Sequence, residues 1–159
     1  VHDEVKADVL NVLPTMRAGA IAVRTGLANM NARWCGVNFL TFESTVAKDV
    51  HVLGDSIQIA PGMPKSGHMA NSQAKVAAAA IVAQLNGWPV NPAPMINNTC
   101  YSYVDAKNVI HVASVHQYVA AEKTFKTVAG SGGVSSAPNE LEGTYAWSWA
   151  RTIWADSLA

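Results

Sequence analysis

Two short stretches carry the residues best suited to bind a polar ligand, and a proline-rich loop separates them. Gly54 and Asp55 follow an apolar run at residues 50–53, and Lys65 and Ser66 follow the loop. The ionised carboxylate of Asp55 only accepts hydrogen bonds, so it needs donors wherever water is excluded. A helix that begins at Ser66 would offer free N–H groups and the positive end of its dipole to an electron-rich group. We therefore expect a ligand site between Asp55 and Ser66, with Lys65 either beside the ligand or in solvent.

Two elements must position these side chains. Residues 50–53 are predicted to form a buried strand that stops at Gly54, at the carboxyl edge of an α/β sheet, where such folds bind ligands. Two prolines exclude regular structure in the loop that follows. A helix of about 20 residues, or roughly 30 Å, is therefore predicted from Ser66 as N-cap to Leu85, with Gly87 closing it.

Other segments extend this pattern of alternating helix and strand. Residues 8–13 are predicted to form a strand, and residues 20–28 a short helix. Residues 76–85 of the long helix are apolar almost all round, which predicts that this part is covered on more than one side. The alternation favours an α/β fold.

The character of the chain changes after Trp88. Three prolines within residues 89–95 indicate an extended linker and a domain boundary. Beyond it, strand-like runs at residues 99–104, 109–119 and 123–128 predict an antiparallel meander.

A last helix is predicted to open at residues 138–140, with an acidic residue near its start. Apolar residues recur at every fourth position in it, so this helix is expected to dock through one stripe. The stripe consists of Leu141, Tyr145, Trp149 and Ile153.

The overall composition restricts the class of protein. With 159 residues, half of them hydrophobic, the chain can form one substantial core. A net charge of zero and the lack of a Lys/Arg cluster argue against a nucleic-acid partner. No apolar run approaches the roughly 18 residues of a membrane span, so we expect a soluble protein. The first residues do not resemble a natural beginning, which suggests a fragment or a processed chain.

The cysteines and histidines by themselves point to no metal or haem site. Cys35 and Cys100 form neither a disulfide scaffold nor a zinc or haem motif, and two unpaired thiols are favoured over a bridge between them. Read alone, Cys100 is more typical of a small buried hydrophobic residue than of a redox centre. His111 and His116 are five residues apart on a predicted strand, so they face opposite sides and cannot share a metal ion.

Seven stretches along the chain together form a specific pattern. They are DVLNVLP at residues 8–14 with RAG at 17–19, TFEST at 41–45, HVLGD at 51–55, MPKSG at 63–67, ANSQAKVAAAA at 70–80, NTCYS at 98–102 and YAWSW at 145–149. Through them the chain resembles, nearly end to end, the C-terminal part of the flavin-binding subunit of flavocytochrome c sulfide dehydrogenase. The combination of MPKSG, ANSQ and NTCYS is far rarer than a lone Gly-Asp.

The resemblance implies a glutathione-reductase-like fold that binds FAD. On this basis residues 1–16 would end the nicotinamide-domain-like half, residues 17–88 would be the C-terminal part of the FAD-binding domain, and residues 89–159 would be a small α+β interface domain. The N-terminal half of the FAD domain, with its glycine-rich loop and covalent flavin attachment, has no counterpart here. The chain alone is therefore expected to be inactive and unable to hold FAD tightly.

The resemblance also assigns roles to six residues. Gly54 and Asp55 match the motif whose carboxylate binds the ribityl chain of the flavin, and the start of the long helix would face the flavin ring. Cys100 matches one half of a redox-active disulfide whose partner lies on a missing segment. Trp149 matches a tryptophan near the flavin. The implied cofactor-binding residues are Gly54, Asp55, Lys65 and Ser66, and the implied catalytic residues are Cys100 and Trp149.

Two positions depart from the family pattern. The family often has Cys-Ile after Gly-Asp and Tyr after MPKSG, where this chain has Ser56 and His68. Neither residue is therefore given a role from the family.

The function implied is an FAD-dependent oxidation of sulfide in the periplasm. Hydrosulfide would attack the disulfide that includes Cys100, and electrons would pass through the flavin to a haem on a separate c-type cytochrome subunit. The alternatives are a sulfide:quinone or another pyridine nucleotide-disulfide oxidoreductase, which the electron acceptor would distinguish. A non-enzymatic interaction domain would show no bound flavin.

Overall fold

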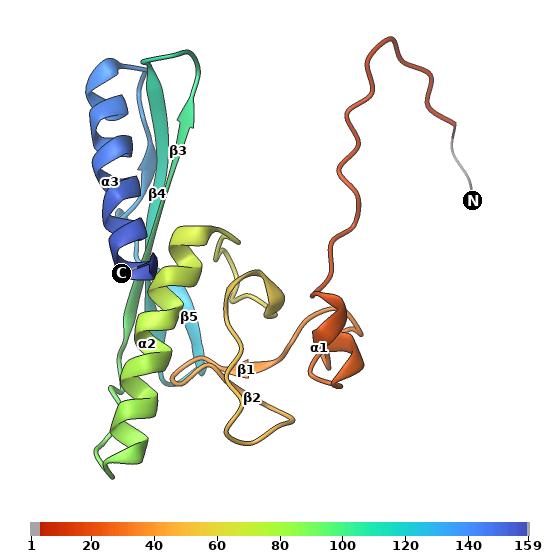
Figure 1. Cartoon of the computed structure of the whole chain (residues 1–159), viewed down its shortest axis with the longest axis vertical. Coiled ribbons are helices and arrows are strands. Elements are labelled where there is room, and N and C mark those ends of the chain that lie inside the picture. Colours follow the sequence, from red (N-terminus) through yellow and green to blue (C-terminus); the bar gives the residue numbers. More distant parts are fainter. Residues whose placement is uncertain (1–3, 159) are drawn as a thin grey trace.

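The computed structural model describes residues 4–158 and combines helices with antiparallel sheets (Figure 1). This mixed architecture is consistent with the predicted α/β class. In chain order the elements are α1 (Ala20–Arg24), β1 (Val37–Asn38), β2 (Glu43–Ser44), the 3₁₀ turn η1 (Gly54–Ser56), α2 (Gly67–Leu85), β3 (Met95–Tyr103), β4 (Val109–Val119), β5 (Thr124–Thr127), β6 (Gly133–Val134) and α3 (Glu140–Leu158).

The predicted antiparallel meander is confirmed. β3, β4 and β5 lie side by side in this order, and β6 also pairs with β4. β4 has the predicted bounds, and its pairing with β3 runs from Met95 opposite Gln117 to Tyr103 opposite Val109. β3 has only β4 as a neighbour within residues 4–158, so one of its edges is free of strand partners.

The predicted helix from Ser66 to Leu85 is confirmed as α2, which packs against β3 (Figure 1). Its inward face carries Met69, Gln73 and Ala77, which are buried. Small side chains allow the helix to approach the sheet closely, and larger residues from both sides complete the core. The core contains Phe42, Ile57, Ala60, Met63, Met69, Ala77, Ile96, Tyr118 and Phe125.

The predicted cover on more than one side of residues 76–85 is wrong. Ala78, Ala79 and Val82 are exposed, and Leu85 is 82% exposed. The apolar composition of this segment misled the prediction, because alanine has so little side-chain surface that leaving it in water costs little.

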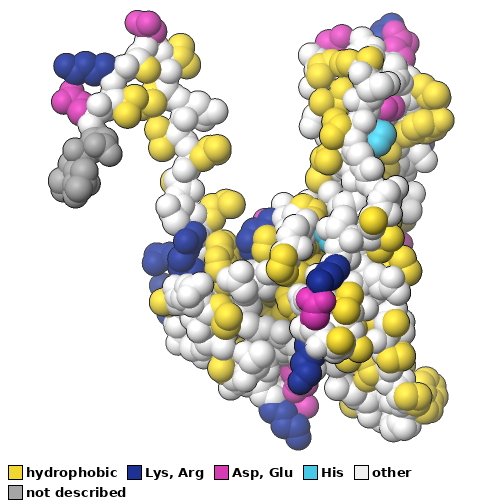
Figure 2. All heavy atoms as spheres, turned by 180° about the vertical axis from the view of Figure 1, so that it is seen from behind, with side chains coloured by type: hydrophobic (Ala, Val, Ile, Leu, Met, Phe, Trp, Pro, Cys, Tyr) yellow, Lys and Arg dark blue, Asp and Glu magenta, His cyan; other side chains and the backbone are white. Residues whose placement is uncertain are grey.

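Two predicted strands are absent from the described residues. Residues 8–13 are extended and exposed and run away from the rest of the molecule, as Figures 1 and 2 show. Residues 50–53 make only one isolated bridge, at His51 with Glu43, and Asp55 lies in a 3₁₀ turn instead of at a strand end. Both segments have the composition of strands, but a strand also needs a neighbour that pairs along its length.

The predicted docking of the last helix is confirmed only in part. α3 lies against β4, and its buried residues are Gly143 and Ala146. Leu141 and Tyr145 from the predicted stripe are more than half exposed, while Trp149 is partly buried. A helix has 3.6 residues per turn, so a strict spacing of four drifts off the contact face over several turns.

Gly143 is the point at which α3 comes closest to the hairpin between β3 and β4. A Cβ atom added there would lie 2.4 Å from the carbonyl oxygen of Lys107. We therefore expect Gly143→Ala to reduce the free energy of unfolding by about 1–3 kcal/mol, since backbone must move to relieve the overlap. Urea unfolding followed by circular dichroism measures this effect. Gly67→Ala is the matched control, because that glycine also lies in a helix but has open space around it; equal losses in both variants would contradict the explanation.

A fully buried histidine links β4 to β5. His116 lies with its Nε2 2.9 Å from Ser114 Oγ and its Nδ1 3.4 Å from Thr127 Oγ1. Burial lowers the pKa of His116 from its ordinary value of 6.5. The folded protein therefore keeps this ring neutral at pH values where the unfolded chain already takes up a proton.

Acidification is expected to weaken the fold through this ring. The contribution of neutral His116 to the free energy of unfolding is fully present above about pH 6.5. It is lost as the pH falls from there through the lowered pKa of the folded state. Urea unfolding across this range should show a falling free energy of unfolding in the wild type. His116→Gln keeps hydrogen-bonding groups but cannot titrate, so it should reduce the slope. An unchanged slope would show that other groups cause the effect.

Within residues 4–158 no helix is both long and apolar enough to cross a membrane. Over the same range, no three His, Cys, Asp or Glu side chains lie close enough together to hold a metal ion.

Candidate functional site

The start of α2 carries the predicted N-cap. Ser66 accepts a hydrogen bond from the backbone N–H of Met69 at 3.1 Å, as the sequence predicts. Its hydroxyl also donates to Oδ1 of Asn98 on β3. The helix start is thereby tied to the middle of the strand.

Asn98 extends this contact to the predicted catalytic cysteine. It is buried, and its Nδ2 lies 3.4 Å from Sγ of Cys100, which is partly exposed. Ser66, Asn98 and Cys100 therefore form one connected group. Both cysteines are free thiols, as predicted, but Cys35 is fully buried and burial raises the pKa of its thiol.

The turn that carries Asp55 is hydrogen-bonded to the second turn of α2. Gly54 has a positive φ of 71°, which favours glycine, and its N–H donates to Oε1 of Gln73 at 2.6 Å. Gln73 is buried within α2, and its Nε2 donates to Sδ of Met63. Asp55 is exposed, and no residue in 4–158 donates a hydrogen bond to its carboxylate.

Lys65 fastens the same turn through its ammonium group. Nζ donates to the carbonyl oxygens of Asp55 at 2.5 Å and Ile57 at 2.8 Å, and it lies 3.8 Å from the ring centre of Trp34. Burial lowers the pKa of Lys65, although the attraction of the Asp55 carboxylate opposes this. The ammonium is therefore directed at groups of the protein itself, which neither of the sequence-based expectations for Lys65 included.

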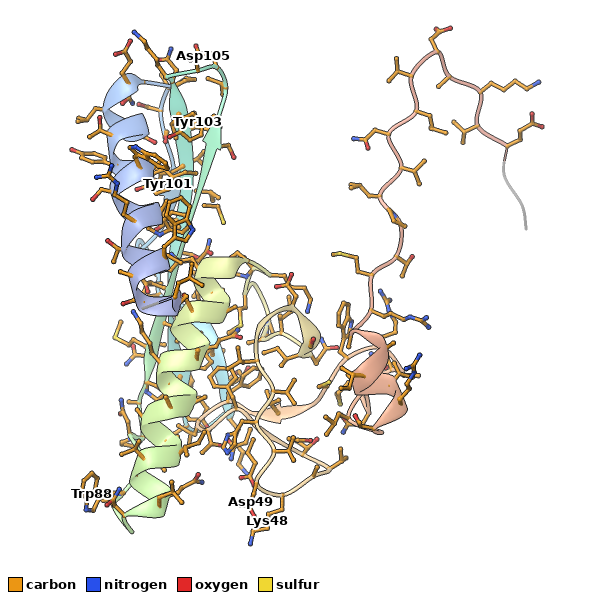
Figure 3. All side chains as sticks on the ribbon, in the orientation of Figure 1. Lys48, Asp49, Trp88, Tyr101, Tyr103 and Asp105 are labelled. Atoms are coloured by element: carbon orange, nitrogen blue, oxygen red, sulfur yellow. The ribbon has the colours of Figure 1, made fainter. Side chains whose placement is uncertain are left out.

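Trp149 reaches the site through His68, a residue to which the sequence analysis gave no role. Nδ1 of His68 accepts from the backbone N–H of Thr99 at 2.9 Å and from Nε1 of Trp149 at 3.3 Å. The His68 and Trp149 rings meet edge to face with centres 5.4 Å apart. The ring centre of Tyr101 lies 5.7 Å from that of Trp149, and Figure 3 places Tyr101 along β3 next to α3.

The structure thus brings most of the predicted site residues to one junction. α2, β3 and α3 meet where Ser66 contacts Asn98 and where Trp149 contacts His68. The 3₁₀ turn is attached through Lys65. An open groove between α2 and α3 begins beside this junction. Its lining consists of Leu53, Gly67, Ala70, Asn71, Ala74, Lys75, Ala78, Ile153, Asp156 and Ser157.

Three residues that hold the junction were missed from the sequence: Gln73, Asn98 and His68. Gln73 and Asn98 lie within the quoted ANSQ and NTCYS motifs, yet no role was assigned to them. Gln73 lies just before residues 76–85, for which cover was predicted, and this was a usable signal because a buried amide needs partners. His68 gave no such signal, since a polar residue near a helix start is ordinarily solvated.

A comparison with protein families bears directly on this junction. Residues 92–158 match the family model described as "Flavocytochrome c sulphide dehydrogenase, flavin-binding". The predicted resemblance is therefore confirmed for the part of the chain that includes β3, the meander and α3, with Cys100 and Trp149 among the matched residues.

The family supports a flavoprotein role, with FAD as the cofactor and an FAD-dependent oxidoreductase as the class of enzyme. Its name implies a cytochrome partner in the complex. The individual roles of Gly54, Asp55, Lys65, Ser66 and Cys100 stay predictions, as does that of Trp149. The predicted domain limits of 1–16, 17–88 and 89–159 also stay predictions.

Gln73 offers a direct test of how the turn that carries Asp55 is held to α2. In Gln73→Leu the N–H of Gly54 loses its acceptor, and a buried donor left without a partner costs about 1–3 kcal/mol. We expect this loss in the free energy of unfolding, together with faster amide hydrogen exchange at Gly54. Gln84→Leu is the matched control, because Gln84 is exposed on the same helix. Unchanged exchange at Gly54 would contradict the assigned contact.

Proposed function

We propose that the full-length protein is an FAD-dependent sulfide dehydrogenase and that this chain supplies one side of its flavin site. The observation that carries the proposal is the hydrogen-bonded group of Ser66, Asn98 and Cys100. It joins a helix start to a partly exposed thiol, and the thiol lies in the segment that matches a flavin-binding family. A helix start and a thiol are the two features that this chemistry needs close together.

The free polar groups at the junction fit a flavin. Within residues 4–158, nothing accepts from the backbone N–H groups of Gly67 and His68, and nothing donates to the carboxylate of Asp55. The N–H groups suit the carbonyl oxygens of a flavin ring, and the carboxylate suits the hydroxyl groups of a ribityl chain. Gly67, His68 and Asp55 would therefore hold the cofactor, with Ser66 and Lys65 supporting them from behind.

Lys65 and Ser66 act in this proposal mainly through the backbone that they fix. Lys65 holds the carbonyls of Asp55 and Ile57, which keeps the Asp55 turn beside the helix start. Ser66 caps the helix and leaves the next N–H groups free. The Lys65 charge also adds to the positive potential of the helix start, which would favour an electron-rich group there.

Cys100 would supply the sulfur chemistry. In the oxidised protein it would be paired with a second cysteine, which the resemblance puts on another segment of the full-length protein. Attack by hydrosulfide on this disulfide breaks the S–S bond, forms a new S–S bond to the incoming sulfur, and leaves its electron pair on the released thiolate. Sulfide is thereby oxidised to the level of a persulfide, and the disulfide is the group reduced.

FAD, when bound, would supply a two-electron acceptor that can release electrons one at a time. This property suits a c-type cytochrome subunit as the next carrier, with the haem on that subunit and not on this chain. We also propose the periplasm as the location, on the basis of the resemblance.

The test is Cys100→Ser in the full-length protein. We expect this variant to retain FAD and to lose sulfide-dependent reduction of the flavin, because a hydroxyl cannot form the disulfide. Flavin absorbance before and after anaerobic addition of sulfide measures both properties. Reoxidation by cytochrome c, a quinone analogue or NAD⁺ then identifies the class of acceptor.

Cys35→Ala is the matched control for this experiment. Cys35 is fully buried and its thiol is stabilised against ionisation by burial, so its loss should leave reduction by sulfide intact. Normal reduction in Cys100→Ser would refute the role of Cys100. Absence of FAD from the wild-type protein would refute the proposed function as a whole.

A further inference from the structure

We propose that His68 is a positioning residue for Trp149, fixed as the neutral tautomer that carries its proton on Nε2. In this form the ring holds the indole of α3 beside β3. The inference rests on the proposed function only for its consequence in catalysis, because the tautomer and the contact concern residues of this chain alone.

The tautomer follows from the two donors that Nδ1 receives. The backbone N–H of Thr99 and the indole N–H of Trp149 both point at this atom, at 2.9 and 3.3 Å. A backbone amide nitrogen and an indole nitrogen can only donate. Nδ1 must therefore offer a lone pair, and the single proton of the neutral ring must be on Nε2.

The surroundings of the ring favour the neutral form. His68 is partly buried, and burial lowers its pKa from the ordinary value of 6.5. Protonation at Nδ1 would replace two accepted hydrogen bonds with a donor facing two donors. The ring also meets Trp149 edge to face, with planes at 78°, which is a preferred geometry for aromatic pairs.

The Nε2 side of the ring is the outward side. No residue in 4–158 forms a hydrogen bond with Nε2 of His68, and this range contains no buried side-chain nitrogen or oxygen without a partner. Nε2 therefore reaches the surface. The ring consequently has an inner atom that accepts from the protein and an outer N–H that remains free.

The contact with His68 engages the indole N–H, which is the one polar group of the Trp149 side chain. The indole N–H of Trp149 has His68 as its partner, and the remaining aromatic contact is with Tyr101. Thr99 fixes the ring of His68 to the free edge of β3, one residue before Cys100. Trp149 is therefore located relative to the backbone of β3 through His68, not through the packing of α3 alone.

Three substitutions of His68 test the inner acceptor, Nδ1, and the outer donor, Nε2, separately and together. In His68→Asn the amide oxygen can occupy the place of Nδ1 and accept from Thr99 and Trp149, while the outer N–H is lost. In His68→Gln the amide reaches the place of Nε2 and keeps an outer donor, while the inner acceptor is lost. His68→Phe removes both and keeps a ring of similar shape.

The first measurement is made on the wild-type full-length protein with ¹⁵N-labelled histidine and tryptophan. A long-range ¹H–¹⁵N spectrum should show His68 with an unprotonated Nδ1 and a protonated Nε2. Hydrogen exchange of the Trp149 indole should be at least about threefold faster in His68→Gln and His68→Phe than in the wild type, the effect of losing one ordinary hydrogen bond. His68→Asn should stay near the wild type.

The second measurement connects the contact to the reaction. The rate of flavin reduction by sulfide should fall by about threefold or more in His68→Gln and His68→Phe with FAD content unchanged, and should be retained in His68→Asn. A proton on Nδ1 in the wild type, or equal indole exchange in all variants, would overturn the inference. If wild-type flavin is not reduced by sulfide, the proposed function fails, while the tautomer and exchange data still decide the role of His68.

Discussion

An edge strand presents backbone N–H and C=O groups that no neighbouring strand satisfies, and β3 is such a strand within the described residues. The first turns of α2 satisfy part of this edge. Ser72 donates to the carbonyl of Asn97 at 3.0 Å, and His68 accepts from the N–H of Thr99 at 2.9 Å. The seating of α2 on β3 is the constraint on which the functional site depends. Because the helix must cover the edge with its polar first turns, its N-terminus is brought to the strand position that carries Cys100.

The same helix start organises the loop before it. Lys65 lies just before the N-cap of α2 and Gln73 lies in its second turn, and each holds a backbone group of the turn that carries Asp55. Each partner is a backbone group fixed in its own turn, so the geometry is stiff. Contacts of this kind fix the backbone of the turn that carries Asp55 although no sheet stands behind it.

Much of the local structure was predictable because it depends on short-range physics. Ser66 after a proline identifies a helix start, and the alternation of residues 109–119 identifies a strand, since each signal concerns neighbours in the chain. The strands predicted at residues 8–13 and 50–53 failed for a different reason. An apolar extended segment becomes a strand only when another segment pairs with it, and no local pattern supplies that partner.

For the site, the sequence by itself determined which residues are candidates: an acidic turn, a capped alanine-rich helix, a cysteine within a rare motif and an aromatic last helix. The match over residues 92–158 confirms the resemblance that those motifs carried. Only the tertiary structure decided that Asn98 connects Ser66 to Cys100 and that His68 connects Trp149 to β3. The physical reason is that a hydrogen bond between residues far apart in the chain depends on how helix and strand seat against each other. That seating is set by the whole core, whereas composition and spacing report only on the residues nearby.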